Sequence, residues 1–166
     1  MAKTLIYLQE RGLDDFDVLK EKAEAVSDRF NELSERIKDL DGKLNANADL
    51  QKQIATYSKT RATYAEYRKA GYSKAFKATH EADILLHQMA KKFFDGLGYG
   101  REKKLPKVAD LRAEYAPMLE EKKQAYKDYR QARTEMQELV TAKANVEKFL
   151  NLGGRDSERE TERTEL

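Results

Sequence analysis

The residues best suited to chemistry lie in the middle of the chain, where tyrosines and cations alternate between residues 57 and 76 in the segment YSKTRATYAEYRKAGYSKAF. Aromatic rings can stack on unpaired bases, and neighbouring Lys or Arg side chains can contact the phosphates of the same strand. This combination predicts a surface that binds DNA. We assign to it Tyr57, Lys59, Arg61, Tyr64, Tyr67, Arg68, Lys69, Tyr72, Lys74 and Lys77.

The same segment also has a purely structural interpretation. Tyr57 and Tyr64 can belong to the contact between two paired helices, while the lysines and arginines form a solvated face. Tyrosine suits both interpretations, because it can bury its ring and still present its hydroxyl group at the surface. The sequence leaves both interpretations open.

A second group of residues has the chemistry of a metal site. His80, Asp83 and His87 are spaced so that a helix would carry all three on one face. Two imidazoles and a carboxylate are a possible ligand set for zinc or iron. The spacing is not that of a zinc peptidase, however, and packed or capping histidines explain the pair better than a metal site does. We therefore expect no metal and no other cofactor.

Carboxylates are abundant, but no pair of them lies in an apolar sequence setting that would raise a pKa for acid–base catalysis. No arrangement of Ser, His and Asp indicates a nucleophile. We therefore expect a protein that is not an enzyme.

The composition is that of long, thinly packed helices. Charged residues make up 37% of the 166-residue chain and apolar residues 40%, and there is no cysteine, so disulfides and thiolate metal sites are excluded. No apolar run approaches the roughly 20 residues of a membrane span, and the N-terminus lacks the features of a secretory signal. We expect a cytoplasmic protein that does not enter a membrane.

The net charge is only +2, but its distribution is uneven. Residues 51–78 contain seven Lys or Arg and a single acidic residue, whereas residues 1–50 contain eight Lys or Arg and 12 acidic residues. A basic middle beside an acidic N-terminal part predicts a local site for an anionic partner.

Two helices are predicted in the first half of the chain. The first spans residues 3–11 and ends at Gly12, and Asp14 or Asp15 then caps a long helix that ends at Gly71. In the long helix the apolar spacing alternates between three and four residues, as in a coiled coil, and it slips near residues 45–47. The residues that carry this pattern are Phe30, Leu33, Ile37, Leu40 and Leu44.

The second half of the chain predicts two further helices. Ser73 caps one that runs to about Phe94, and the other starts near Pro106 and ends at the glycine pair 153–154. Pro117 predicts a kink or break near residues 114–116 of the last helix. The apolar face of the helix after Ser73 includes Phe76, Ile84, Leu85, Met89 and Phe93.

These elements predict an all-α fold, an elongated antiparallel helical hairpin or coiled coil of two long helices with one or two shorter helices packed on it. Residues 1–152 would form a single module, and residues 153–166 a disordered charged tail. A homodimer formed through the same apolar seams is a competing arrangement.

Several blocks of the sequence resemble a known family. These are YSKTRATYAEYRKAGYSKAFKATHEADILLHQMAKKFFDGLG, KLPKVADLRAEYAPMLEEKKQAYKDYRQARTEM and TAKANVEKFL, with TLIYLQERGLDDFDVLKEKA near the N-terminus. In length and order they resemble the C-terminal helical region of relaxases, the mobilization nucleases of bacterial conjugative elements. The resemblance covers about residues 4–152.

The resemblance implies a role without catalysis. No segment resembles the nuclease domain of the family, so none of its catalytic residues carries over, and His80 and His87 do not match its metal histidines. The implied role is that of an accessory module of DNA mobilization, which contacts single-stranded or transfer-origin DNA, relaxosome proteins or coupling proteins. The alternative is a mobile-element coiled coil that binds a protein, such as a host factor, and does not bind DNA.

Overall fold

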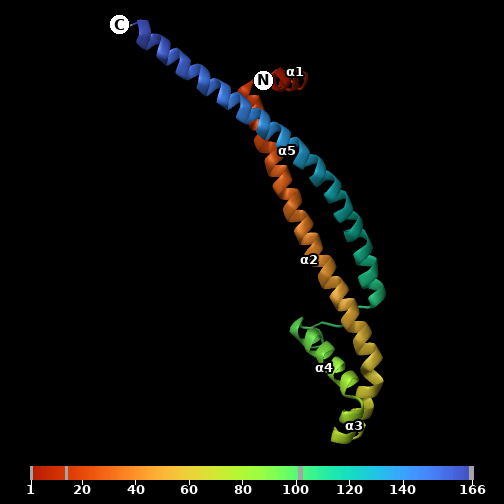
Figure 1. Ribbon diagram of the computed structural model, residues 1–166. Coiled ribbons are helices and arrows are strands. Elements are labelled where there is room, and N and C mark those ends of the chain that lie inside the picture. Colours follow the sequence, from red (N-terminus) through yellow and green to blue (C-terminus); the bar gives the residue numbers. More distant parts are fainter. Residues whose placement is uncertain (1, 14, 101–102, 165–166) are drawn as a thin grey trace. The chain divides into compact units, whose positions relative to one another are not determined.

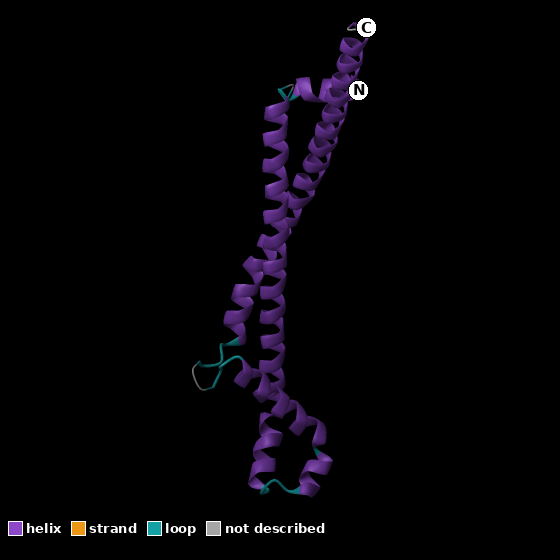
Figure 2. Cartoon of the chain, turned by 90° about the vertical axis from the view of Figure 1, so that its left-hand side faces the viewer, coloured by secondary structure: helices purple, strands orange, loops and turns teal. Residues whose placement is uncertain are grey.

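The structure is a computed structural model that describes residues 2–13, 15–100 and 103–164, with side chains up to Asn151 except those of Ala2 and Leu5. Helices are the only named regular elements in this part of the chain (Figures 1 and 2), which confirms the all-α prediction. They are α1 (Ala2–Glu10), α2 (Phe16–Lys69), α3 (Lys74–Thr79), α4 (Glu81–Gly96) and α5 (Val108–Thr164).

The chain divides into two compact units, and both long helices contribute to each. Unit 1 comprises Met1–Lys38 and Lys123–Leu166, and unit 2 comprises Asp39–Lys122. Within each unit, residues later in α2 contact residues earlier in α5, so the two helices are antiparallel, as predicted. In unit 1 Lys22 pairs with Glu135 and Phe30 stacks on Tyr129.

The predicted helix ends on either side of α2 are confirmed. Gly12 has a φ of 64° and follows α1, and Gly71 has a φ of 61° and follows α2. The left-handed conformation is accessible to glycine without steric cost, which makes it the usual stop signal of a helix. At the start of α2, the backbone N–H of Asp17 donates to the Asp15 carboxylate over 2.9 Å.

Unit 1 has an aliphatic core. Its buried residues come from α1, α2, α5 and the link after α1, with Tyr7, Phe16, Met136 and Val146 packed around them. Leu19 and Leu139 are 0% and 1% exposed and are its most deeply buried large side chains. The complete buried cluster is Leu8, Leu13, Leu19, Ala23, Val26, Leu139 and Ala142.

Unit 2 departs from the heptad pattern at the predicted position. The seam positions after Leu44 are Asn47 and Leu50, so two successive steps of three residues replace the usual three and four. Asn47 is 8% exposed, and its Nδ2 donates to the backbone carbonyl of Leu111 in the first turn of α5 over 3.0 Å. Its Oδ1 accepts from Nε2 of Gln51 over 2.6 Å, which satisfies both ends of the buried amide.

The single helix predicted from Ser73 to Phe94 is wrong in one respect, because it is divided into α3 and α4 at His80. His80 has φ −127° and ψ 29°, outside the helical region, and its backbone N–H still bonds back to Phe76 and Lys77. The predicted cap is confirmed, since Ser73 Oγ accepts from the Phe76 N–H over 3.4 Å. Of the predicted apolar face, Ile84 is buried and Phe76 and Phe93 are half-buried, but Leu85 and Met89 are exposed, because they lie about 100° and 140° around the helix from Ile84.

Of the kink or break predicted near Pro117, the break is wrong, because α5 continues through it without interruption, whereas the kink stays a prediction. Proline removes the hydrogen bond to the carbonyl four residues earlier, here that of Ala113. Pro117 and Ala113 are both exposed, so water can solvate the released carbonyl.

The end of α5 lies beyond the predicted helix end. The helix runs past the glycine pair 153–154 to Thr164. Side chains after Asn151 lie outside the described residues, so the disordered tail proposed for 153–166 stays a prediction.

Candidate nucleic-acid interface

The centre of the predicted DNA-binding segment is a stack of three rings contributed by α2 and α4. The imidazole of His87 lies between Tyr57 and Tyr64, with centroid distances of 4.4 Å and 4.3 Å and interplanar angles of 23° and 18°. Two residues seven positions apart on a helix are separated by about 10.5 Å along its axis, enough for one ring between theirs. The heptad spacing of the two tyrosines therefore creates a slot that α4 fills.

A hydrogen bond fixes the imidazole in this slot. Thr60, between the two tyrosines on α2, lies with its Oγ1 3.0 Å from Nδ1 of His87. The single hydroxyl proton of Thr60 is donated to the backbone carbonyl of Thr56 over 2.8 Å. We therefore assign a proton to Nδ1, which donates it to Thr60 Oγ1. Burial lowers the pKa of His87, and the charge of Lys91 lowers it further, so the neutral form is favoured.

The row of rings continues from this stack onto α3. Tyr64 meets Tyr67 edge-on at 6.0 Å, and Tyr67 is stacked with Phe76 of α3 at 6.2 Å. Phe76 in turn stacks on His80 at 4.3 Å. We call the rings that join α2, α3 and α4 the aromatic ladder, which consists of Tyr57, Tyr64, Tyr67, Phe76, His80, His87 and Phe94.

The ladder assigns a packing role to three of the four tyrosines predicted to bind DNA. Tyr57 and Tyr64 are half-buried and each has one face against His87, while Tyr67 is only 8% exposed. These contacts match the structural interpretation of the segment. Stacking on DNA bases was predicted for all four rings, but only Tyr72 is open to a base, with 56% of its surface exposed.

Tyr72 is held in an uncommon backbone conformation. Its φ is 60°, in the left-handed region that non-glycine residues rarely adopt, and it follows Gly71, which has the same conformation. Its backbone N–H donates to the carbonyl of Tyr67, and its ring packs edge-on against the Tyr67 ring at 5.2 Å. These contacts fix an exposed aromatic side chain at the turn between α2 and α3.

The exposure of the cations in the segment agrees with both interpretations, a DNA-binding surface and a solvated face. All six are exposed, and they lie on the last three turns of α2 and on α3, on either side of the turn at Tyr72. Lys69 pairs with Glu66 over 2.7 Å, but both side chains are well exposed, and such a pair adds little stability and can exchange for a phosphate. The exposed cations are Lys59, Arg61, Arg68, Lys69, Lys74 and Lys77.

The three residues with metal-site chemistry are not brought together. The break at His80 places it outside α4, where its Nδ1 lies 3.2 Å from the carbonyl of Phe76. Asp83 accepts a hydrogen bond from Thr63, and His87 is enclosed between the two tyrosines. Among the described residues, no group of three or more His, Cys, Asp or Glu side chains is placed to hold a metal ion.

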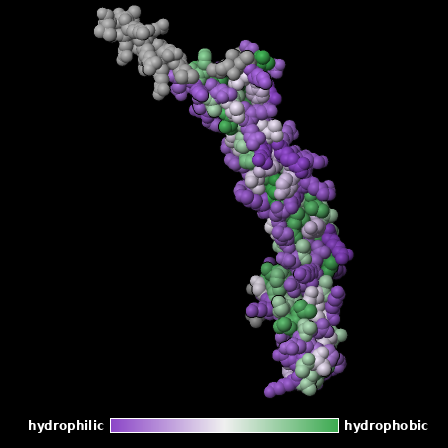
Figure 3. Space-filling view, viewed as in Figure 1, coloured by the Kyte–Doolittle hydropathy of each residue, from purple (hydrophilic) through white to green (hydrophobic). Residues whose placement is uncertain are grey.

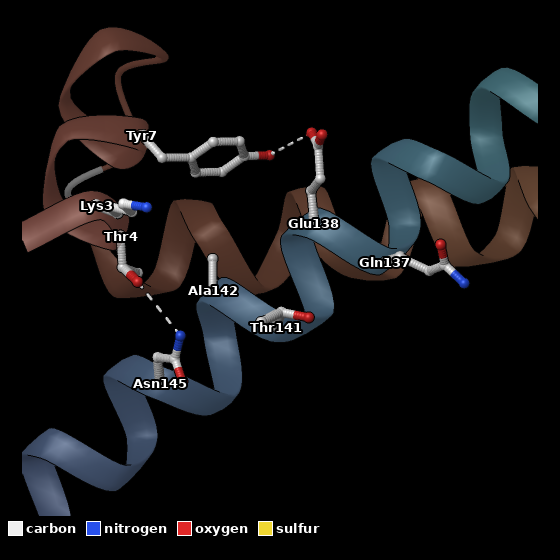
Figure 4. Close-up of a pocket in the computed structure, with 8 residues that line it drawn as sticks. All are labelled: Lys3, Thr4, Tyr7, Gln137, Glu138, Thr141, Ala142 and Asn145. Carbon is white, nitrogen blue, oxygen red and sulfur yellow. Dashed lines mark hydrogen bonds between the residues drawn. The ribbon is translucent and has the colours of Figure 1, made fainter. Parts of the chain in front are cut away.

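Unit 1 has an open groove between α1 and α5 that sequence reasoning did not identify (Figure 4). Its volume is about 400 Å³. Across it, Tyr7 donates to the Glu138 carboxylate over 3.4 Å and Asn145 donates to Thr4 over 3.3 Å. Burial raises the pKa of Tyr7, and the carboxylate of Glu138 raises it too, against the opposite effect of Arg11.

Sequence reasoning offered packing as a role for His87, but it identified neither the two tyrosines that enclose the ring nor the hydrogen bond to Thr60. The signal was present, because Tyr57, Thr60, Tyr64 and Tyr67 continue the steps of three and four residues that mark the seam of α2. No spacing rule, however, identifies the residue of α4 that fills the slot between two tyrosines.

Comparison with protein-family models, with curated proteins and with solved structures finds no significant match for this chain. The resemblance to the relaxase C-terminal region therefore depends on the sequence blocks alone. No helix in the described part of the chain is both long enough and apolar enough to span a bilayer.

Proposed function

We propose that the chain is a non-catalytic, DNA-binding accessory module of a mobilization relaxase, and that the turn between α2 and α3 is its DNA contact. The observation that carries the proposal is the exposure of the cations on both sides of this turn, Arg68, Lys69, Lys74 and Lys77, with Lys59 and Arg61 exposed further back on α2. Phosphate contacts supply most of the affinity of nucleic-acid binding that does not depend on sequence. The relaxase context is inferred from the resemblance of the sequence blocks.

The rings of the segment pack the helices together while its cations stay exposed, and this arrangement supports the proposed mode of binding. The aromatic ladder fixes α3 against the end of α2, so the cations on both helices keep their spacing without a strand bound. A surface that is ordered before binding loses less conformational entropy when the ligand arrives. Tyr72 is the ring left to stack on a base, so the proposed ligand is DNA that offers unpaired bases.

The first test is reversal of charge at three cations near the turn. Arg68→Glu, Lys69→Glu and Lys74→Glu together should weaken binding to a fluorescent single-stranded oligonucleotide by about 100-fold at low salt, because three phosphate contacts become repulsions. The slope of log affinity against log salt should also become shallower by about two, from roughly 0.7 for each contact on a single strand. Fluorescence anisotropy titrations over a series of salt concentrations measure both quantities.

A matched control distinguishes the loss of a local binding site from a general effect of the lower net charge. Lys20→Glu, Lys127→Glu and Lys148→Glu remove the same charge from exposed positions outside residues 51–78 and should leave the affinity nearly unchanged. Circular dichroism should show the same helicity for both variants. Equal affinity of the wild type and the Arg68, Lys69 and Lys74 variant would disprove the proposed DNA contact.

A second candidate function is that of a protein-interaction module without DNA binding, and the groove between α1 and α5 favours it. Thr4, Gln137, Thr141 and Asn145 line this groove and offer hydrogen-bonding groups to an extended segment of a partner. Salt distinguishes the two functions, because binding in such a groove depends weakly on ionic strength, whereas phosphate binding falls steeply.

A further inference from the structure

Helix α4 has a second apolar face besides the one that packs on α2. Leu85, Leu86 and Met89 are 54%, 45% and 56% exposed, and the exposed Ala82 lies one turn before Leu86. At 100° per residue, these four side chains fall within about 100° of the helix circumference. Figure 3 shows hydrophobic residues gathered over α4.

This face differs from the other exposed apolar residues of the described chain. Ile6, Val18 and Val140 are single exposed residues on three different helices, which is normal on protein surfaces, and α5 also exposes the pair Phe149 and Leu150. On α4, by contrast, three large apolar side chains occur within five residues. A continuous apolar stripe on a helix whose opposite side is already packed indicates a contact with another molecule.

The charges beside the stripe indicate which molecule this is. Glu81 and Lys92 are 11 residues apart, about three turns, so both lie on the same edge of the stripe at opposite ends. When two copies of α4 pair in antiparallel orientation about a two-fold axis, each edge faces the same edge of the other copy. Glu81 of each copy then lies opposite Lys92 of the other, and the axis passes near Leu86.

We propose that a second copy of this chain covers the stripe, so that the protein forms a two-fold symmetric dimer through antiparallel α4 helices. An interface of this kind must be complementary to itself, and a stripe with an anion at one end and a cation at the other meets this condition. The pair of helices is small compared with the roughly 1,200–2,000 Å² of stable complexes. The dimer is therefore weak and depends on concentration.

The test measures mass against concentration by sedimentation velocity and light scattering, from the micromolar to the submillimolar range. The wild type should change from monomer to dimer, and Leu85→Lys with Met89→Lys should stay a monomer with unchanged helicity, because both side chains are already exposed. Val140→Lys, at an apolar position of α5 that is 48% exposed, is the control and should dimerise like the wild type. A wild type that is monomeric throughout, or a Leu85/Met89 variant that still dimerises, would refute the proposal.

Charge reversal tests the orientation. Glu81→Lys alone, or Lys92→Glu alone, places like charges together at both ends of the interface and should weaken the dimer about tenfold. Combining the two restores both pairs and should restore the affinity. Additive weakening in the double variant would exclude the antiparallel arrangement.

The absence of native cysteines allows a further check. Leu86→Cys lies near the two-fold axis and should form a disulfide-linked dimer under mild oxidation. Ala82→Cys should not, because antiparallel pairing separates the two copies of residue 82 by about 13 Å along the helices. Efficient crosslinking at residue 82 would instead show a parallel pair and overturn the proposed symmetry.

Discussion

The two units use different interactions to hold the same pair of helices together. The buried cluster of unit 1 is aliphatic, with Leu19 and Leu139 at its centre. In the described part of the chain, the three buried polar residues, Asn47, Thr60 and His87, all lie in unit 2. None of the buried polar side-chain atoms described lacks a hydrogen-bond partner.

Because of this difference, the contacts of unit 1 mainly add stability, whereas those of unit 2 also fix the orientation of the side chains. Apolar burial stabilises a helix pair without fixing the orientation of each side chain, since it follows the area removed from water. Hydrogen bonds and stacked rings have preferred distances and angles, and a buried polar group left without its partner costs about 1–3 kcal/mol. Unit 2 carries the cations proposed to bind DNA, and its directional contacts orient the helices on which these cations lie.

The largest expected effect is on the aliphatic core. Leu139→Ala should lower the free energy of unfolding of unit 1 by about 3 kcal/mol, because it leaves a cavity beside Leu19 and Ala142. Hydrogen exchange read by mass spectrometry should show faster exchange in residues 16–38 and 123–151. The neighbouring Val140→Ala, at an exposed position, should change stability by less than about 0.5 kcal/mol. Unit 2 has its own buried cluster of Leu50, Ala90, Phe94 and Leu111. If residues 50–94 lost protection equally, the two clusters would not be distinct.

A somewhat smaller effect is expected when the ladder loses its central ring. His87→Ala should cost about 2 kcal/mol, because it empties the slot between Tyr57 and Tyr64 and removes their stacking partner. The near-ultraviolet circular dichroism of the tyrosines should weaken as well. His80→Ala removes an exposed ring stacked on Phe76 and should cost less than about 1 kcal/mol. An equal loss of stability from both substitutions would show that the enclosed ring of His87 contributes no more than the exposed ring of His80.

The smallest effect is a dependence of stability on pH that only unit 2 should show. Because the folded-state pKa of His87 is lowered, the unfolded chain binds a proton at higher pH than the folded one. The stabilisation is complete above the unfolded pKa of about 6.5 and is lost as pH falls towards the folded pKa, by at most about 1.4 kcal/mol per pH unit. Melting curves at pH values from neutral to about 5.5 measure this loss. His87→Phe, which keeps a ring in the slot, should remove it, and an unchanged pH dependence in that variant would assign the effect to other groups.

The parts of the fold that followed from sequence are those fixed by local chemistry. Gly12 and Gly71 end helices because of their backbone freedom, and Ser73 caps α3 through its hydroxyl group. The seam at Ile37, Leu40 and Leu44 follows from the helix repeat. These signals act within a few residues of themselves, so a single sequence reveals them.

The parts that sequence did not reveal depend on contacts between distant segments. Ile84, Leu85 and Met89 were all predicted to face the core, but helix α4 carries apolar residues on two sides, and the contact with α2 buries Ile84 and His87 while Leu85 and Met89 stay exposed. The tyrosines could be assigned either to bases or to a seam, because their partner, His87, lies on another helix. The exposure of the cations is the part of the candidate site that the charge pattern anticipated.

The polar seam position at Asn47 has a consequence for how the chain finds its alignment. Helices with a repeating apolar pattern can slide past one another by seven residues and still bury leucines against leucines. Such a slip would carry the amide of Asn47 away from the carbonyl of Leu111 and leave it in an apolar setting. A single polar side chain thus selects one register of the helix pair among several that bury similar apolar residues. A leucine at this position would increase apolar burial but would no longer select that register.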